Sequence, residues 1–149
     1  MTFSQTCTIP VARERLWDFL MDVPRVSRCL PGVERVAPLE GNAYQGVFRV
    51  KLGPISIGLE GVVAIEEQSR GAWRAALRAD ATERKLGGGM RARARMSLAP
   101  AGDGATTLTV ETDLTLLGKI GEFGQPLIKK KADALLQEFA ANIKSALAA

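Results

Sequence analysis

The chain offers few side chains that could carry out acid–base or metal chemistry. None of its 149 residues is a histidine, which removes the commonest general base and the commonest metal ligand. Its two cysteines, Cys7 and Cys29, are too few for a disulfide framework and lack the spacing of metal ligands. We therefore predict no catalytic residue and no metal site, and we expect both thiols to be buried and reduced.

Three ionisable side chains remain as candidates for acid–base work, namely Glu60, Glu111 and Lys131. Alternation along the predicted strands places both glutamates on the outward face of a sheet, away from an enclosed substrate. Lys131 lies at the edge of the apolar stripe of a predicted helix. Its ammonium group could reach a polar ligand atom while its stem is buried, or it could simply face solvent.

Arginines at alternate positions make one face of the predicted sheet basic. Arg91, Arg93 and Arg95 share this face, and the predicted register places Arg93 opposite Glu111 and Arg91 opposite Asp113. Such cross-strand ion pairs are typical of a solvated sheet exterior, although the same face could bind an acidic partner protein or anionic lipid headgroups. A net charge of +4 with only 5% aromatic residues argues against nucleic acid as the partner.

Glycines at three-residue spacing precede the last helical pattern. Gly118, Gly121 and Gly124 match neither a dinucleotide-binding fingerprint nor a P-loop, because the spacing differs and no Lys-Ser/Thr pair follows. They predict either a close approach of helix and sheet or a flexible gate to the interior.

The apolar periodicity divides the first part of the chain into a strand and two helices. Residues 3–9 alternate as a half-buried strand. Pro10 predicts the start of a helix, and its apolar residues recur at helical spacing. Residues 25–30 predict a second short helix between prolines.

A period of two begins after Gly32 and predicts six further strands. A turn at residues 53–54 pairs two of them and opposes Val50 to Ile57, Phe48 to Leu59, and Gly46 to Gly61. Trp73 is predicted to lie on the inner face of the following strand. From Gly118 the period returns to 3.6, and Pro126 predicts either a kink or a helix that becomes regular only after Gln125. The order indicates an α+β architecture, and we expect a single domain over residues 1–149.

Small residues gather on the inner face of two adjacent predicted strands. This set comprises Ala75, Ala79, Ala81, Ala92 and Ala94. They could let the long helix pack closely against the sheet, or they could leave a pocket, and the pattern does not choose between these two.

Five local segments resemble the family of the carbon monoxide dehydrogenase G subunit. They are ARERLW (12–17), CLPGVE (29–34), LGPI (52–55), LGKI (117–120) and FGQPLI (123–128). The resemblance implies a START-like (SRPBCC) helix-grip fold, in which a seven-stranded antiparallel sheet curls around a long C-terminal helix, with two short helices after the first strand. It also implies a hydrophobic cavity between sheet and helix, and association with a molybdenum hydroxylase of the carbon monoxide dehydrogenase type.

On this basis we predict a non-catalytic carrier of a small lipophilic ligand, with a respiratory quinone as the candidate and no covalently bound cofactor. Its partner enzyme would use it in assembly, membrane recruitment or electron delivery. The alternatives are a cyclase- or hydratase-type enzyme acting in the same cavity, and an interaction module that docks through its arginines. The predicted cavity wall comprises Trp17, Phe48, Leu59, Leu77, Ala94, Met96, Phe123, Leu127 and Lys131. A polar ligand head is expected near Lys131 or Asn142.

The sequence contains neither a signal-peptide pattern nor an apolar stretch of about 20 residues. We therefore expect a cytoplasmic protein with at most peripheral membrane contact, at the inner face of the membrane.

Overall fold

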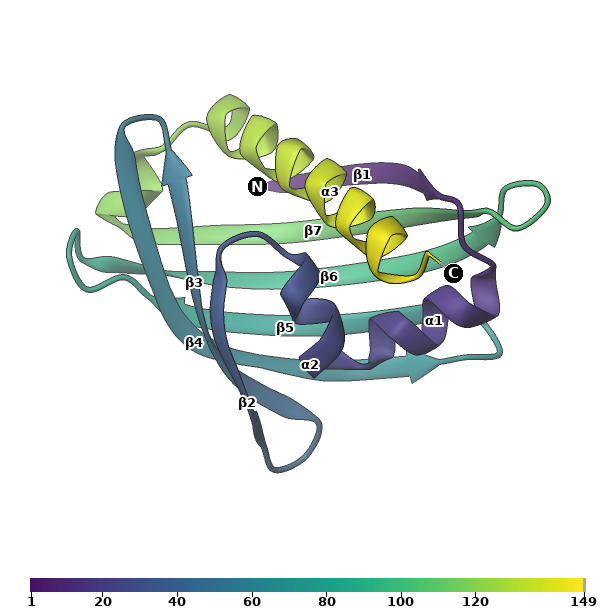
Figure 1. Cartoon of the computed structure of the whole chain (residues 1–149). Helices are drawn as coiled ribbons and strands as arrows, with labels where there is room; N and C mark the ends of the chain where they lie inside the picture. Colours follow the sequence, from purple (N-terminus) through teal and green to yellow (C-terminus); the bar gives the residue numbers. More distant parts are fainter. Residues whose placement is uncertain (149) are drawn as a thin grey trace.

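The computed structural model describes residues 1–148, which form one antiparallel sheet and several helices (Figure 1). In chain order the elements are β1 (Thr2–Ile9), α1 (Arg13–Met21), α2 (Val23–Val26), η1 (Ser27–Cys29), β2 (Val33–Leu39), β3 (Ala43–Leu52), β4 (Ile55–Ser69), β5 (Arg74–Thr82), β6 (Gly88–Pro100), β7 (Thr106–Gly118), η2 (Lys119–Glu122) and α3 (Gln125–Ala146). The two η elements are short 3-10 helices. This order confirms the predicted α+β architecture.

All seven strands belong to one open sheet with the spatial order β1-β7-β6-β5-β4-β3-β2. The sheet curls, and α3 crosses its concave face (Figure 1). The pairing predicted across the turn at residues 53–54 is confirmed. Val50 lies opposite Ile57, and two positions further along Phe48 lies opposite Leu59.

The two neighbouring strands β4 and β5 approach each other closely at Gly61. A Cβ atom at Gly61 would collide with the backbone oxygen of Asp80 and would lie 2.6 Å from the Cα atom of Ala81. No larger residue fits here without a shift of the backbone, so glycine is required for the strands to meet in this geometry.

The helical segment after β1 begins later than predicted. Pro10 does not open it, because Val11 is buried in the core and its carbonyl oxygen accepts a hydrogen bond from Thr106 Oγ1 at 2.7 Å. Ala12 is consequently extended, with φ −61° and ψ 146°, and α1 begins only at Arg13.

The second predicted helix, residues 25–30, also has different bounds. Helix α2 already begins at Val23, because the Asp22 carboxylate caps it by accepting a hydrogen bond from the Arg25 N–H at 3.3 Å. The chain then tightens into the 3-10 turn η1 instead of continuing as one α-helix.

Trp73 does not lie on a strand, contrary to the prediction. It ends the turn between β4 and β5 with a φ of 56°. Its ring makes edge-to-face contact with Trp17, with centroids 6.0 Å apart. The Arg13 guanidinium lies 4.2 Å and the Arg70 guanidinium 5.5 Å from the ring centre. These cation–π and aromatic contacts connect the turn to α1.

Helix α3 begins at Gln125, so Pro126 falls in its first turn. Backbone N–H groups there have no partner within the helix, so the N–H that proline lacks costs no hydrogen bond. This confirms the second of the two predictions for the proline. Gly118 has a φ of 69° where β7 ends, and a Cβ atom on Gly121 would lie 3.0 Å from the Leu116 oxygen. Gly121 thus allows close packing of η2 against β7, while Gly118 allows a close approach to Gly87 and Gly88 where β6 begins.

The core has two clusters, one towards each end of α3. The first joins β1, α1 and η1 to the C-terminal half of α3, with Leu16, Leu108 and Ile143 among its most buried side chains. The second joins the β3–β4 turn and η2 to the first turns of α3, around Leu52 and Ile120. Together they hold the helix across the sheet.

Candidate functional site

An apolar cavity of about 400 Å³ lies beside the first core cluster. Its floor is the concave face of β3, β4, β5, β6 and β7, its roof comes from α1, α2, η1 and the start of β2, and Phe139 of α3 closes one side. Most of its lining side chains are half-buried, so the space is in contact with solvent. Of the two predicted possibilities, pocket or close packing, the structure therefore has the pocket.

The position of α3 explains why this space exists. The helix lies beside the edge strand β1, and its side chain Asp133 accepts a hydrogen bond from Gln5 of β1 at 2.9 Å (Figure 1). Near its other end Asn142 donates to the backbone oxygen of Cys29 in η1, at 2.9 Å. The short helices therefore provide most of the roof of the cavity, and α3 contributes Phe139 at its side.

Small side chains on the floor add to this volume. Ala75 and Ala76 of β5 and Ala94 of β6 line the cavity, together with Gly46 of β3. Ala79, Ala81 and Ala92, also predicted, are absent from its lining.

The chemistry of the lining is almost wholly apolar. Its side chains include no carboxylate, lysine, arginine or cysteine, and the polar residues among them are Ser27, Tyr44 and Gln45. Such a surface can bind an apolar molecule and provides few groups for acid–base chemistry.

Three of the nine predicted wall residues line this cavity, namely Leu77, Ala94 and Met96. Trp17 is buried in the first core cluster against Trp73.

The other five predicted wall residues belong to the opposite end of the molecule or to its surface. Phe48, Leu59 and Phe123 pack in or against the second core cluster. Leu127 is exposed and Lys131 is half-buried, and neither lines the cavity. Alternation placed Phe48 and Leu59 on the correct face of the sheet, but they lie in its other half.

The family resemblance implies that the two short helices close one end of the cavity, but of their residues only Trp17 was predicted for its wall. Leu20 and Met21 of α1, Val26 of α2 and Leu30 after η1 all line the cavity. Their apolar spacing was visible, but it indicated burial in general and not a particular space. Phe139 of α3 also lines the cavity, and the helical period of its segment does not by itself assign it to this space.

Comparison with known proteins identifies the family. The model of the family described as the G subunit of carbon monoxide dehydrogenase (CoxG) matches residues 6–148. The chain belongs to the CoxG family. A comparison with the sequences of curated proteins found no match.

Solved structures show the same helix-grip fold as this CoxG-family chain. A conserved protein from Geobacillus kaustophilus superposes with a TM-score of 0.87 at 18% sequence identity, over 97% of this chain and 93% of that one. A START superfamily protein from Mycobacterium smegmatis gives a TM-score of 0.66 at 15% identity, over 98% and 96%. Zhui aromatase/cyclase from Streptomyces sp. R1128 gives 0.62 at 14% identity, over 98% and 90%. The predicted START-like fold is thereby confirmed.

The carboxylates of this CoxG-family protein lie away from the cavity lining. Glu60 is within 3.2 Å of Arg84 and 4.0 Å of Arg35, while Glu111 is 3.5 Å from Arg95. All these ion pairs are solvent-exposed, so neither glutamate is placed to act on a molecule in the cavity.

One buried carboxylate, Glu83 in the turn between β5 and β6, was not predicted as a notable residue. It accepts hydrogen bonds from the backbone N–H groups of Gly58 and of Lys85, the latter at 2.6 Å. Burial by itself raises the pKa of Glu83, but hydrogen bonds from Lys85, Gly58 and Leu86, with the positive charge of Lys85, outweigh it and hold the pKa below its ordinary value. The hydrogen bonds of Glu83 therefore connect the turn between β5 and β6 to Gly58 of β4.

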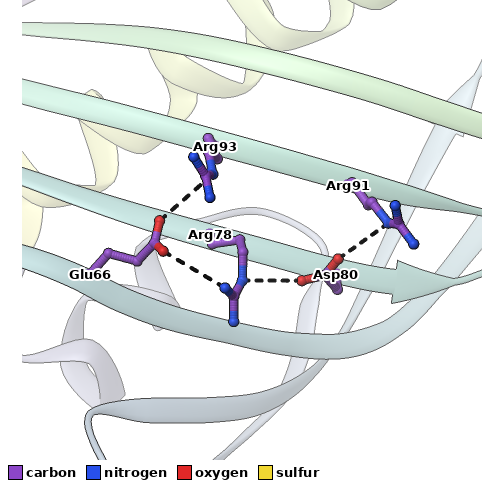
Figure 2. Close-up of polar contacts among 5 residues, drawn as sticks. All are labelled: Glu66, Arg78, Asp80, Arg91 and Arg93. Atoms are coloured by element: carbon purple, nitrogen blue, oxygen red, sulfur yellow. Dashed lines mark ion pairs between the residues drawn. The ribbon is translucent and has the colours of Figure 1, made fainter.

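The convex face of the sheet carries a network of ion pairs (Figure 2). Glu66 lies 3.7 Å from Arg78 and 3.9 Å from Arg93, and Asp80 lies 3.4 Å from Arg78 and 3.6 Å from Arg91. Charges of both signs alternate across three strands, so these arginines do not form a uniformly basic patch. This arrangement favours the solvated exterior over a docking face for an acidic partner.

The predicted register of β6 against β7 is wrong by two residues. Arg93 lies opposite Asp113, Arg95 opposite Glu111, and Arg91 opposite Thr115. The loop between the strands comprises residues 101–105, and two glycines in it have positive φ angles, so β6 still includes Pro100, which pairs with Thr106 at the start of β7. A shift of two preserves the face on which each side chain lies.

Neither a metal site nor a membrane span is found in the described structure. Residues 1–148 contain no cluster of three or more cysteine, aspartate or glutamate side chains that could hold a metal ion. Across the same residues, no helix combines the length and hydrophobicity needed to cross a lipid bilayer.

Proposed function

We propose that this protein binds and carries a small lipophilic molecule without chemically changing it. The observation that carries this proposal is the cavity of about 400 Å³, which falls within the usual range for ligand pockets, roughly 300–1,000 Å³. Its apolar lining would be stabilised by an apolar occupant, because each CH₂ group removed from water contributes about 0.8 kcal/mol.

The described lining contains no carboxylate, lysine, arginine or cysteine side chain, and this favours a carrier over a cyclase- or hydratase-type enzyme. Such side chains are the usual general acids and bases that exchange a proton with a bound substrate. The fold does not decide between the two, because unrelated functions share it.

Within this proposal the ligand is a respiratory quinone, and the partner is a molybdenum hydroxylase of the carbon monoxide dehydrogenase type. Membership of a family described as a subunit of carbon monoxide dehydrogenase supports the partner. Such an enzyme must pass its electrons onward, and a quinone has the apolar body that this lining would accept. The cavity would enclose the ring and the first part of the tail.

Extraction of the natural ligand tests the proposal. Protein purified from its native host under mild conditions should release about one lipophilic molecule per chain into organic solvent, identified by mass spectrometry. Protein that releases none, and that also fails to bind added quinones, would rule out the carrier function.

A matched pair of variants tests whether this cavity is the binding site. Ala94→Phe places a phenyl ring in the cavity and should reduce the bound ligand at least tenfold, whereas Ala92→Phe adds the same ring two residues away on the same strand face, outside the lining. Thermal unfolding of both variants controls for damage to the fold. Equal ligand loss in both, at equal stability, would argue against this site.

A further inference from the structure

The polar side chains of the cavity lie on one side of it. Tyr44 and Gln45 come from β3, and Ser27 comes from η1, which contacts the edge strand β2. The opposite side is formed by Leu108 and Val110 of β7 and Phe139 of α3, which are all apolar. The cavity therefore has a polar side and an apolar side.

The distance between these sides suits an elongated molecule. In the sheet order, β3 and β7 are separated by β4, β5 and β6. Four spacings of about 4.8 Å place them about 19 Å apart along the sheet, and less across its curved interior. A ligand that spans this width would contact both sides at once.

Of the three polar residues, Tyr44 is the one whose side chain is available to a ligand. The Ser27 hydroxyl already donates to the backbone oxygen of Pro24 at 3.0 Å. Gln45 is exposed and also lines a groove on the outer face of β2 and β3, as alternation along the strand requires. Among the described residues, no hydrogen-bond partner is found for the Tyr44 hydroxyl.

We infer that the cavity binds its ligand in one orientation, with an acceptor oxygen of the polar head on the Tyr44 hydroxyl and the apolar body directed towards Phe139. This inference rests on the proposed carrier function and narrows the ligand to an amphiphile with an acceptor oxygen, such as a carbonyl, at one end. It replaces Lys131 and Asn142 as the expected contacts of the head, since Lys131 is outside the lining and Asn142 is bound to Cys29.

The isosteric change Tyr44→Phe tests the contact with the head. Two probes are compared, a benzoquinone with a ten-carbon alkyl chain and a benzene with the same chain. Loss of one hydrogen bond should lower the affinity for the quinone by roughly 2- to 12-fold and leave the affinity for the alkylbenzene unchanged. Binding is measured by quenching or displacement of a fluorescent fatty-acid analogue.

A spectroscopic readout separates this role from a structural one. Tyr44 is the only tyrosine in the chain, so tyrosine labelled with ¹³C at Cζ gives a single resonance. The quinone should shift that resonance more than the alkylbenzene does. If both probes bind but the two affinities fall equally in Tyr44→Phe, or the resonance responds equally to both, the inference is wrong and the carrier function still stands. If neither probe binds the wild-type protein, the carrier function itself fails.

Phe139 tests the other end of the ligand. Phe139→Ala should lower the affinity for both probes, and the loss of affinity should be smaller for probes whose alkyl chain is too short to reach α3. The milder Phe139→Leu should show the same dependence on chain length if Phe139→Ala does not fold. Equal losses for all chain lengths would overturn the proposed orientation.

Discussion

The side chain of Asn142 donates a hydrogen bond to the backbone oxygen of Cys29 at 2.9 Å, and this bond connects α3 to η1. The two residues are 113 positions apart in the sequence. Since η1 forms part of the roof of the cavity, the bond fixes the roof relative to the helix.

Removal of this bond should loosen the roof. Asn142→Ala should lower the free energy of unfolding by about 0.5–1.5 kcal/mol and speed amide hydrogen exchange in residues 27–30. Gln5→Ala is the matched control, because it removes the bond that Gln5 donates to Asp133, on the β1 side of α3. It should leave exchange in residues 27–30 unchanged; faster exchange in both variants would contradict a specific role for Asn142.

Glu83 should make stability depend on pH. Because its pKa in the folded chain is lowered, the charged form stabilises the fold above the unfolded-state pKa, and that contribution is lost as the pH falls through the folded-state value. Glu83→Gln should therefore lower the free energy of unfolding by about 1–3 kcal/mol at pH 7, and by less below about pH 4. Urea unfolding at both pH values measures this. A cost that does not change with pH would show that the charge of Glu83 is unimportant.

Gly61→Ala should destabilise the protein by more than about 2 kcal/mol, because the added methyl group collides with the backbone of β5. Gly71→Ala offers a control in the turn after β4, where a Cβ atom would meet nothing within 4 Å. That change should be neutral or slightly stabilising. Similar melting temperatures for the two variants would contradict the close approach at Gly61.

The ion pairs of the convex face should contribute little to stability. Glu66→Gln removes the partner shared by Arg78 and Arg93, yet all three side chains are at least a third exposed. We expect the free energy of unfolding to fall by less than about 1 kcal/mol, and this difference should disappear in 1 M NaCl. Urea titrations with and without salt check this, and a loss above about 2 kcal/mol that persists in salt would refute it.

Much of the fold could be predicted from the sequence because alternation determines the face of each strand. The turn at residues 53–54 also fixed the register of β3 and β4, since it is tight and contains Gly53 and Pro54. The β6–β7 register could not be obtained in this way. The sequence does not determine where its loop, residues 101–105, begins and ends. A register shift of two residues also leaves the apolar pattern intact.

The candidate site was less predictable because a period of two defines a face and not a position along it. Leu77 and Leu59 both point to the concave side, but only Leu77 lines the cavity, whereas Leu59 is buried in the second core cluster. That distinction depends on where a helix from a distant part of the sequence lies. Glu83 was missed for a related reason, because its partners are backbone groups brought together by the fold.

The residues of the second core cluster and those of the cavity lining form two sets without a common member. Packing in the second core cluster is thus independent of the cavity lining, whereas the first core cluster shares Ala75 and Leu108 with it. Substitutions elsewhere on the floor or in the roof of the cavity can therefore change which molecule fits, while the second core cluster stays intact.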